Sequence, residues 1–159
     1  DLSLAAQSHR TGLIVLRSFG KFLGLAGVRL GFVLAELKLL KLLAEQVGPW
    51  AVSGPTRVLG QACLLDYEAH ARQRERSERA SERLVALLSQ YGLPPLGGCA
   101  LFQWLITPHA ERLYDFMARR GILLRLFPHN SSVRLGLPGD EADWLKLEHA
   151  LQAYAQETP

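Results

Sequence analysis

The chain has 159 residues, of which 48% are hydrophobic and 21% charged, values that are ordinary for a globular protein. Its formal net charge is +3, and its arginines are dispersed or lie beside glutamates, so no nucleic-acid partner is expected. Charged residues interrupt every apolar run before it reaches the length of a membrane span, so no membrane partner is expected either. No signal peptide is visible, and Cys63 and Cys99 lie in apolar contexts, so we expect buried free thiols and a cytoplasmic location.

The first fifty residues are predicted to hold two strands and a helix. Residues 13–16 form a short apolar run with β-branched members, and residues 28–35 form a second run; each is typical of a buried strand. A leucine-rich segment over residues 36–46 predicts an amphipathic helix, which Gly48 and Pro49 end.

A long helix is predicted next, over residues 55–91. Ser53 and Pro55 are typical of a helix start, and Gly92 is typical of a helix end. Gly60 is the only glycine or proline between these signals, so we expect one continuous helix.

The last third of the chain alternates between strands and helices. We predict a strand over residues 100–106 and a helix over 109–120. Two strands follow, over 122–127 and 132–137, joined by a turn at 128–130. A final helix capped by Asp140 runs from 141 onward. His129 and Asn130 are interpreted as turn residues. The whole pattern predicts an α/β fold.

Residues 17–32 place three polar side chains at fixed positions in an apolar, glycine-rich stretch. Ser18 precedes Lys21 by three residues, and Arg29 follows Lys21 by eight. Apolar surroundings and a nearby arginine favour the neutral, nucleophilic form of a lysine amine. A hydroxyl and a guanidinium are groups with which proteins hold a phosphate. A phosphorylated aldehyde cofactor such as pyridoxal phosphate (PLP) would engage all three side chains.

The residues alone leave a simpler interpretation open, in which Lys21 is a surface lysine in a turn and Arg29 is a charge at a strand edge. Two other phosphate-binding motifs fit worse. A Walker A loop needs a glycine where this chain has Val15, and a strict G-x-G-x-x-G is absent.

The stretch resembles the Schiff-base segment of the fold-type I PLP-dependent enzymes, in the class I and II aminotransferase group, where Ser-x-x-Lys is followed eight residues later by Arg. The resemblance implies that Lys21 is the Schiff-base lysine and that Ser18 and Arg29 bind the cofactor phosphate. It also implies the C-terminal part of a PLP-dependent transferase fold. We therefore expect residues 1–50 to be the end of a large PLP-binding domain. Residues 51–159 would form a small α/β domain with a mostly antiparallel sheet and the long connecting helix.

Two further arginines are candidate substrate ligands. Arg134 lies mid-strand among apolar residues, and a buried arginine needs an anionic partner, which an internal ion pair could also supply. The resemblance implies that Arg134 binds the substrate α-carboxylate. Arg125 falls where the histidinol-phosphate aminotransferase branch has an arginine that contacts the substrate anion; a structural role for Arg125 stays open. The histidines and cysteines show no metal-ligand spacing, so no metal site is expected.

Three stretches, residues 17–22, 48–55 and 134–139, are most similar to the threonine-phosphate decarboxylase branch of cobalamin biosynthesis. The resemblance implies decarboxylation of L-threonine O-3-phosphate to (R)-1-amino-2-propanol O-2-phosphate by a homodimeric enzyme. Two alternatives stay open at this point. One is a histidinol-phosphate-like aminotransferase, and the other is a non-catalytic C-terminal module used for interaction.

The resemblance also implies that this chain is the C-terminal part of a longer enzyme. In the family, the aspartate that pairs with the pyridine nitrogen, the aromatic residue that stacks on the ring and the glycine-rich phosphate loop lie upstream of the lysine. We therefore expect the 159-residue chain alone to be inactive and to bind PLP weakly or not at all. Residues before about 49 are expected to have unpaired strand edges and to be disordered, rearranged or paired with another copy.

Overall fold

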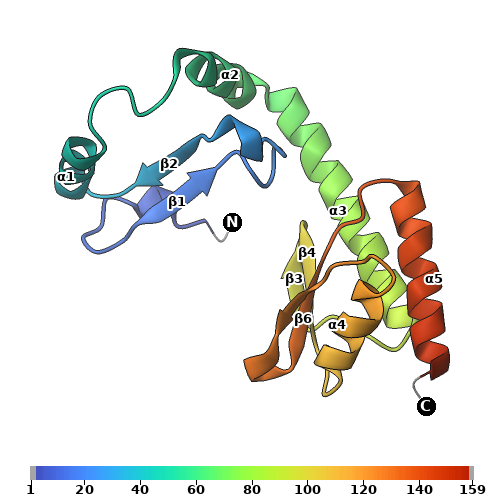
Figure 1. Cartoon of the computed structure of the whole chain (residues 1–159). Coiled ribbons are helices and arrows are strands. Elements are labelled where there is room, and N and C mark those ends of the chain that lie inside the picture. Colours follow the sequence, from blue (N-terminus) through green and yellow to red (C-terminus); the bar gives the residue numbers. More distant parts are fainter. Residues whose placement is uncertain (1–2, 158–159) are drawn as a thin grey trace. The chain divides into compact units, whose positions relative to one another are not determined.

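A computed structural model of the chain describes residues 3–157, which form two compact units that divide after His70 (Figure 1). The sequence prediction places a domain boundary at about residue 50, whereas residues 51–70 make their contacts within the first unit. The assignment of residues 1–50 to a larger domain stays a prediction. No helix in the described part of the chain is both long and apolar enough to span a bilayer.

The first unit is built around a two-stranded antiparallel sheet. Its two strands pair from Val15 opposite Leu34 to Ser18 opposite Gly31. In chain order the unit contains η1 (Ala5–Gln7), β1 (Val15–Ser18), η2 (Ala26–Val28), β2 (Gly31–Leu34), α1 (Leu37–Val47) and α2 (Gly54–Leu65).

Both predicted strands of this unit exist, with shifted bounds, but the predicted burial is wrong, because most residues of both strands are exposed. The second apolar run starts as the short helix η2, and Arg29 follows it in the left-handed region at φ 55°, so Arg29 precedes β2 instead of lying within it. Among the described residues each strand has one unpaired edge, as expected. The expected disorder or rearrangement is not found, because the two strands pair with each other.

The predicted continuous helix over 55–91 is wrong at one residue. Asp66 leaves the helical region, with φ −83° and ψ 74°, and separates α2 from α3 (Tyr67–Gln90). Its Oδ1 accepts a hydrogen bond from the N–H of Ala69 at 2.9 Å, so Asp66 ends one helix and caps the next. The predicted start is confirmed, since the Ser53 hydroxyl accepts a hydrogen bond from the N–H of Thr56.

The second unit contains most of α3 and a four-stranded sheet. After α3 the elements are β3 (Gly97–Cys99), β4 (Phe102–Ile106), α4 (Ala110–Ala118), β5 (Arg125–Phe127), η3 (Pro128–Asn130), β6 (Ser132–Gly136) and α5 (Glu141–Glu157). The sheet is antiparallel throughout, with strand order β3-β4-β6-β5. The sequence did not predict β3, because its two glycines have low strand propensity.

The core of the second unit lies between one face of this sheet and the helices α3, α4 and α5. Alternate strand residues such as Leu105, Val133 and Leu135 point into it and are at most 2% exposed. The helices contribute the remaining large core side chains, among them Leu84, Leu88, Leu113, Met117, Leu147 and Leu151. The three helices cover only this face, so the opposite face of the sheet is left open. Because strand side chains alternate, that face carries residues such as Phe102, Trp104 and Arg134.

Arg83 ties α3 to the first turn of α5. Its guanidinium donates two hydrogen bonds to the Glu141 carboxylate, one of 2.7 Å, and lies 4.3 Å from the centre of the Trp144 ring. The hydrogen bonds from Arg83 lower the pKa of Glu141, and the same contact raises the pKa of Arg83. The pair is exposed, so it positions the two helices more than it stabilises them.

A test of this packing uses two neighbouring glycines of β3. A Cβ added at Gly98 would lie 2.5 Å from both the carbonyl oxygen of Phe102 and Oε1 of Gln103, whereas one added at Gly97 meets nothing within 4 Å. Gly98→Ala is therefore expected to lower the free energy of unfolding by about 1–3 kcal/mol. Gly97→Ala is expected to change it by less than about 0.5 kcal/mol. Urea unfolding followed by circular dichroism measures both, and equal effects would contradict the packing described.

Candidate functional site

The segment that carries Lys21 is a closed loop between the two strands of the first unit. The N–H of Phe19 donates to the carbonyl of Leu30 at 3.3 Å and closes its base. Within it, the N–H of Leu25 donates to the carbonyl of Phe19 at 3.0 Å, and the N–H of Gly24 donates to the carbonyl of Lys21 at 3.1 Å. We call residues 19–30 the Lys21 loop.

Backbone conformation explains part of the glycine pattern in this loop. Gly24 has φ +67°, a left-handed conformation that a residue with a side chain adopts only with strain. The turn that follows Lys21 therefore requires glycine at this position. Arg29 adopts a left-handed conformation without being glycine, which places its backbone directly at the turn into β2.

The Lys21 loop rests on side chains from the rest of the first unit. Phe19 is 3% exposed, and its ring centre lies 5.7 Å from that of Phe32. The Thr56 hydroxyl of α2 donates to the carbonyl of Val28 at 3.4 Å, across the loop's second half. Gly60 of α2 is buried against the same segment, and a Cβ there would lie 2.5 Å from Cδ2 of Leu30. Helix α2 thus holds the end of the loop that carries Arg29.

The three polar side chains of the motif lie at or within this loop, and all three residues are exposed in the structure. Ser18 is the last residue of β1, directly before the loop, and is opposite Gly31. The apolar sequence around Lys21 does not bury it in this chain, because the rest of the unit leaves that residue open to solvent. The Arg29 guanidinium donates to the carbonyl of Ala26 at 3.3 Å, and no carboxylate among residues 3–157 forms an ion pair with it. An amine, a hydroxyl and a guanidinium on one loop form a donor set that fits an aldehyde with a phosphate.

The second group of candidate residues lies on the open face of the sheet in the second unit. Arg134 of β6 is half-buried, and its guanidinium lies 4.9 Å from the centre of the Phe102 ring. Arg125 of β5 is directly opposite Arg134 in the strand register and lies 5.5 Å from the centre of the Phe127 ring. Two cations at opposed positions repel each other, and an anion bound between them would relieve that repulsion.

A cavity of about 390 Å³ opens beside Arg134 on this face. Its lining combines aromatic walls with hydrogen-bond donors: Phe102, Trp104, Phe127, His129, Asn130 and Arg134. From the sequence, His129 and Asn130 are predicted only as turn residues. The strand register that brings their turn beside Arg134 is a long-range property, which no local pattern in the sequence reveals.

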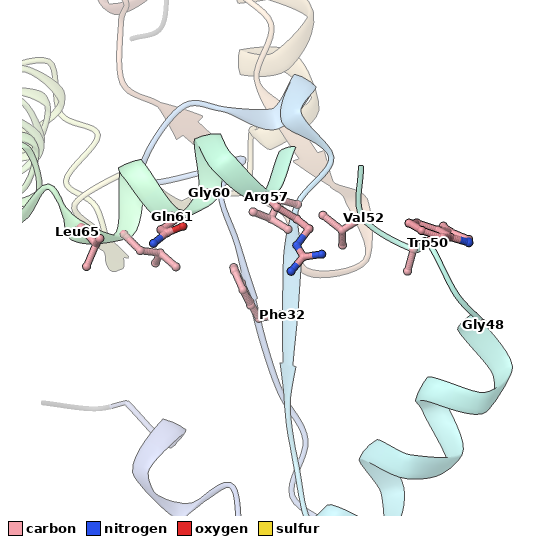
Figure 2. A pocket seen from close by; sticks show the side chains of 11 residues that line it. Phe32, Gly48, Trp50, Val52, Arg57, Gly60, Gln61 and Leu65 are labelled. Carbon is pink, nitrogen blue, oxygen red and sulfur yellow. The ribbon is translucent and has the colours of Figure 1, made fainter. Parts of the chain in front are cut away.

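A larger cavity, of about 650 Å³, lies in the first unit between α2, β2 and the segment after α1. Its walls are mostly apolar, and neither Ser18, Lys21 nor Arg29 lines it. Figure 2 shows Arg57 and Leu65 on α2, Phe32 on β2, and Trp50 on the connecting segment. This cavity is distinct from both groups of candidate residues.

Neither unit offers a metal centre in its described part, since no group of three or more histidine, cysteine or acidic side chains there is arranged to hold an ion. Cys63 is half-buried and Cys99 is exposed, so the predicted burial of Cys99 is wrong; both thiols are free.

The chain matches the family model described as "Aminotransferase class I and II" over residues 2–151. A threonine-phosphate decarboxylase of Pseudomonas aeruginosa is 56% identical over 97% of this chain and 46% of its own length. A threonine-phosphate decarboxylase of a Sinorhizobium species is 41% identical over 95% of this chain and 45% of its own length. The chain thus spans less than half the length of these curated relatives.

The fold agrees with the same family. The crystal structure of histidinol-phosphate aminotransferase from Sinorhizobium meliloti, in complex with pyridoxal-5'-phosphate, aligns with 92% of this chain and 42% of its own, with a TM-score of 0.78. At 22% identity this likeness concerns the fold. The expected C-terminal part of a PLP-dependent transferase fold is confirmed.

The opposed arginines predict that the second unit binds small oxyanions. Sulfate at about five times its dissociation constant should raise the free energy of unfolding by about 1 kcal/mol relative to chloride at the same ionic strength. Arg134→Gln should lose most of this gain, whereas Arg119→Gln, an exposed arginine after α4, should keep it. Thermal unfolding of the three chains measures the effect. A gain that survives in the Arg134 variant would contradict the assignment.

Proposed function

Because this chain belongs to the aminotransferase class I and II family, we propose that the whole protein is a PLP-dependent decarboxylase. It converts L-threonine O-3-phosphate to (R)-1-amino-2-propanol O-2-phosphate and carbon dioxide. The observation that carries the proposal is the Lys21 loop with the adjoining Ser18, which together present a lysine, a serine hydroxyl and an arginine at the family's spacing. The sequence around it is 56% identical to a threonine-phosphate decarboxylase, which favours this reaction over others of the family.

The residues of the Lys21 loop would hold the cofactor. The Lys21 amine would bind it covalently, and Ser18 with Arg29 would hold its phosphate by charge-assisted hydrogen bonds. When bound, PLP supplies an electron sink for a bond broken at the substrate's Cα. The backbone hydrogen bonds of the loop close its base and form the turn after Lys21 in this chain.

The arginines of the second unit would hold the substrate. Arg134 binds the α-carboxylate through two parallel N–H groups, and Arg125 contributes positive charge for the second anionic group. The positions of these anchors determine which bond to Cα is aligned for cleavage. The carboxylate leaves as carbon dioxide, its bonding electrons stay at Cα, and one proton replaces it. We assign delivery of that proton to the Lys21 amine.

For the whole protein we also propose a homodimer in the cytoplasm. The support for an assembly is the apolar surface of the first unit, where Trp50 is 94% exposed, Leu16 74% and Val58 72%. A monomeric protein rarely leaves so much apolar surface uncovered, so further chain or a second copy is expected to cover it. We also propose that the 159-residue chain alone binds PLP weakly and is inactive. The support is that Lys21 in its loop is exposed to solvent.

The direct test is an assay of the whole protein with L-threonine O-3-phosphate, which scores carbon dioxide against keto acid. We expect carbon dioxide and the amino alcohol phosphate, and a loss of at least about 100-fold in Lys21→Ala. Lys38→Ala, in an exposed lysine of α1, should retain activity, and the 159-residue chain should release no carbon dioxide.

Two other outcomes of this assay would contradict the proposed function. Keto acid without carbon dioxide would make the protein an aminotransferase with the same cofactor lysine. An unchanged rate in Lys21→Ala would leave the chain as a non-catalytic module.

A further inference from the structure

We propose that His129 and Asn130 form a phosphate subsite beside Arg134, and that this subsite makes the protein select phosphorylated over unphosphorylated amino acids. The inference rests on the proposed function and adds two residues that the sequence pattern assigned only to a turn. Both residues line the cavity of about 390 Å³ on the open face of the sheet.

The polar groups that line this cavity are suited to an anion. Arg134 offers a guanidinium, His129 a ring N–H and Asn130 a side-chain amide, and no acidic residue is among the lining residues. Arginine has no acceptor to offer, and protonated histidine has none either. A ligand that accepts several hydrogen bonds through oxygen therefore matches the cavity better than a neutral or cationic one.

Asn130 is oriented by a buried neighbour. Its Oδ1 accepts a hydrogen bond from the hydroxyl of Ser132 at 2.6 Å, and Ser132 is fully buried at 0% exposure. With the amide oxygen engaged in this way, the NH2 group is the part of Asn130 that remains to donate toward a ligand.

The turn that carries both residues is held in place from two sides. The N–H of Ser131 donates to the carbonyl of Pro128 at 3.3 Å, and the N–H of Thr107 donates to the carbonyl of Ser131 at 3.0 Å. The His129 ring packs edge-on against Phe127, with 6.3 Å between ring centres and 89° between planes. A subsite on such a fixed turn loses little conformational freedom when a ligand binds.

The two anionic groups of the substrate need different sets of hydrogen-bond donors. A carboxylate has two oxygens, which one guanidinium fork satisfies, and the proposed function gives that role to Arg134. The phosphate of the same substrate has three further oxygens and more negative charge, so it needs additional donors nearby. His129 and Asn130 line the same cavity as Arg134 and supply them.

The first test measures binding and needs no cofactor. The histidine ring signals of the 159-residue chain are followed by NMR while O-phospho-L-threonine or L-threonine is added, and His129→Gln identifies the signal of interest. We expect a saturable shift of the His129 signal with the phosphorylated compound and none with threonine. His109 is exposed and lies outside the cavity, so its signal should stay unchanged and serves as the internal control. An equal shift with threonine, or no shift of His129, would overturn the proposal.

The second test uses the whole protein. His129→Gln is expected to raise KM for L-threonine O-3-phosphate by about tenfold or more, as loss of a charge-assisted hydrogen bond does, with kcat changed much less. His109→Gln should match the unaltered protein. An unchanged KM in His129→Gln, in an active enzyme, would overturn the subsite and leave the proposed function intact. A His129 signal that responds to phosphothreonine in a protein without decarboxylase activity would support the subsite and reject the function.

Discussion

The hydrogen bond from the N–H of Phe19 to the carbonyl of Leu30 is the contact on which the proposed cofactor site in the first unit depends. It joins the end of β1 to the residue before β2 and so turns the stretch between them into a closed loop. Closure places Ser18 opposite Gly31, two residues after Arg29, and Lys21 lies within the closed segment. The backbone hydrogen bonds close the loop, and the buried Phe19 ring anchors its first residue. The backbone conformation of the loop therefore does not depend on a bound ligand in this structure.

In the second unit, strand alternation and register determine where the candidate residues lie. One face of its sheet is covered by three helices, so alternation along each strand places Arg134 on the uncovered face. Antiparallel register then sets Arg125 opposite it and brings the turn with His129 to the rim of one cavity. In the proposed function, the first unit offers groups for a phosphorylated aldehyde, and the second offers groups for a substrate with two anions.

Local signals predicted most of this architecture. Helix starts at Ser53 and Asp140 were visible because their side chains cap backbone N–H groups a few residues away. The break at Asp66 was missed because an aspartate can either continue a helix surface or cap a new helix, and packing decides between them. The motif residues were proposed from their spacing and from the resemblance to a known family, because the residues alone left a surface lysine as an alternative. The exposure of Lys21 and the role of the turn at 128–130 depend on contacts between distant segments, which spacing does not encode.

The most direct test of the account is to load the whole protein with PLP, reduce it with borohydride, digest it and locate the pyridoxyl group by mass spectrometry. A single modified peptide is expected, with the added mass on Lys21. A label on another lysine such as Lys38 or Lys146, or no label after loading, would contradict the assignment of the cofactor site.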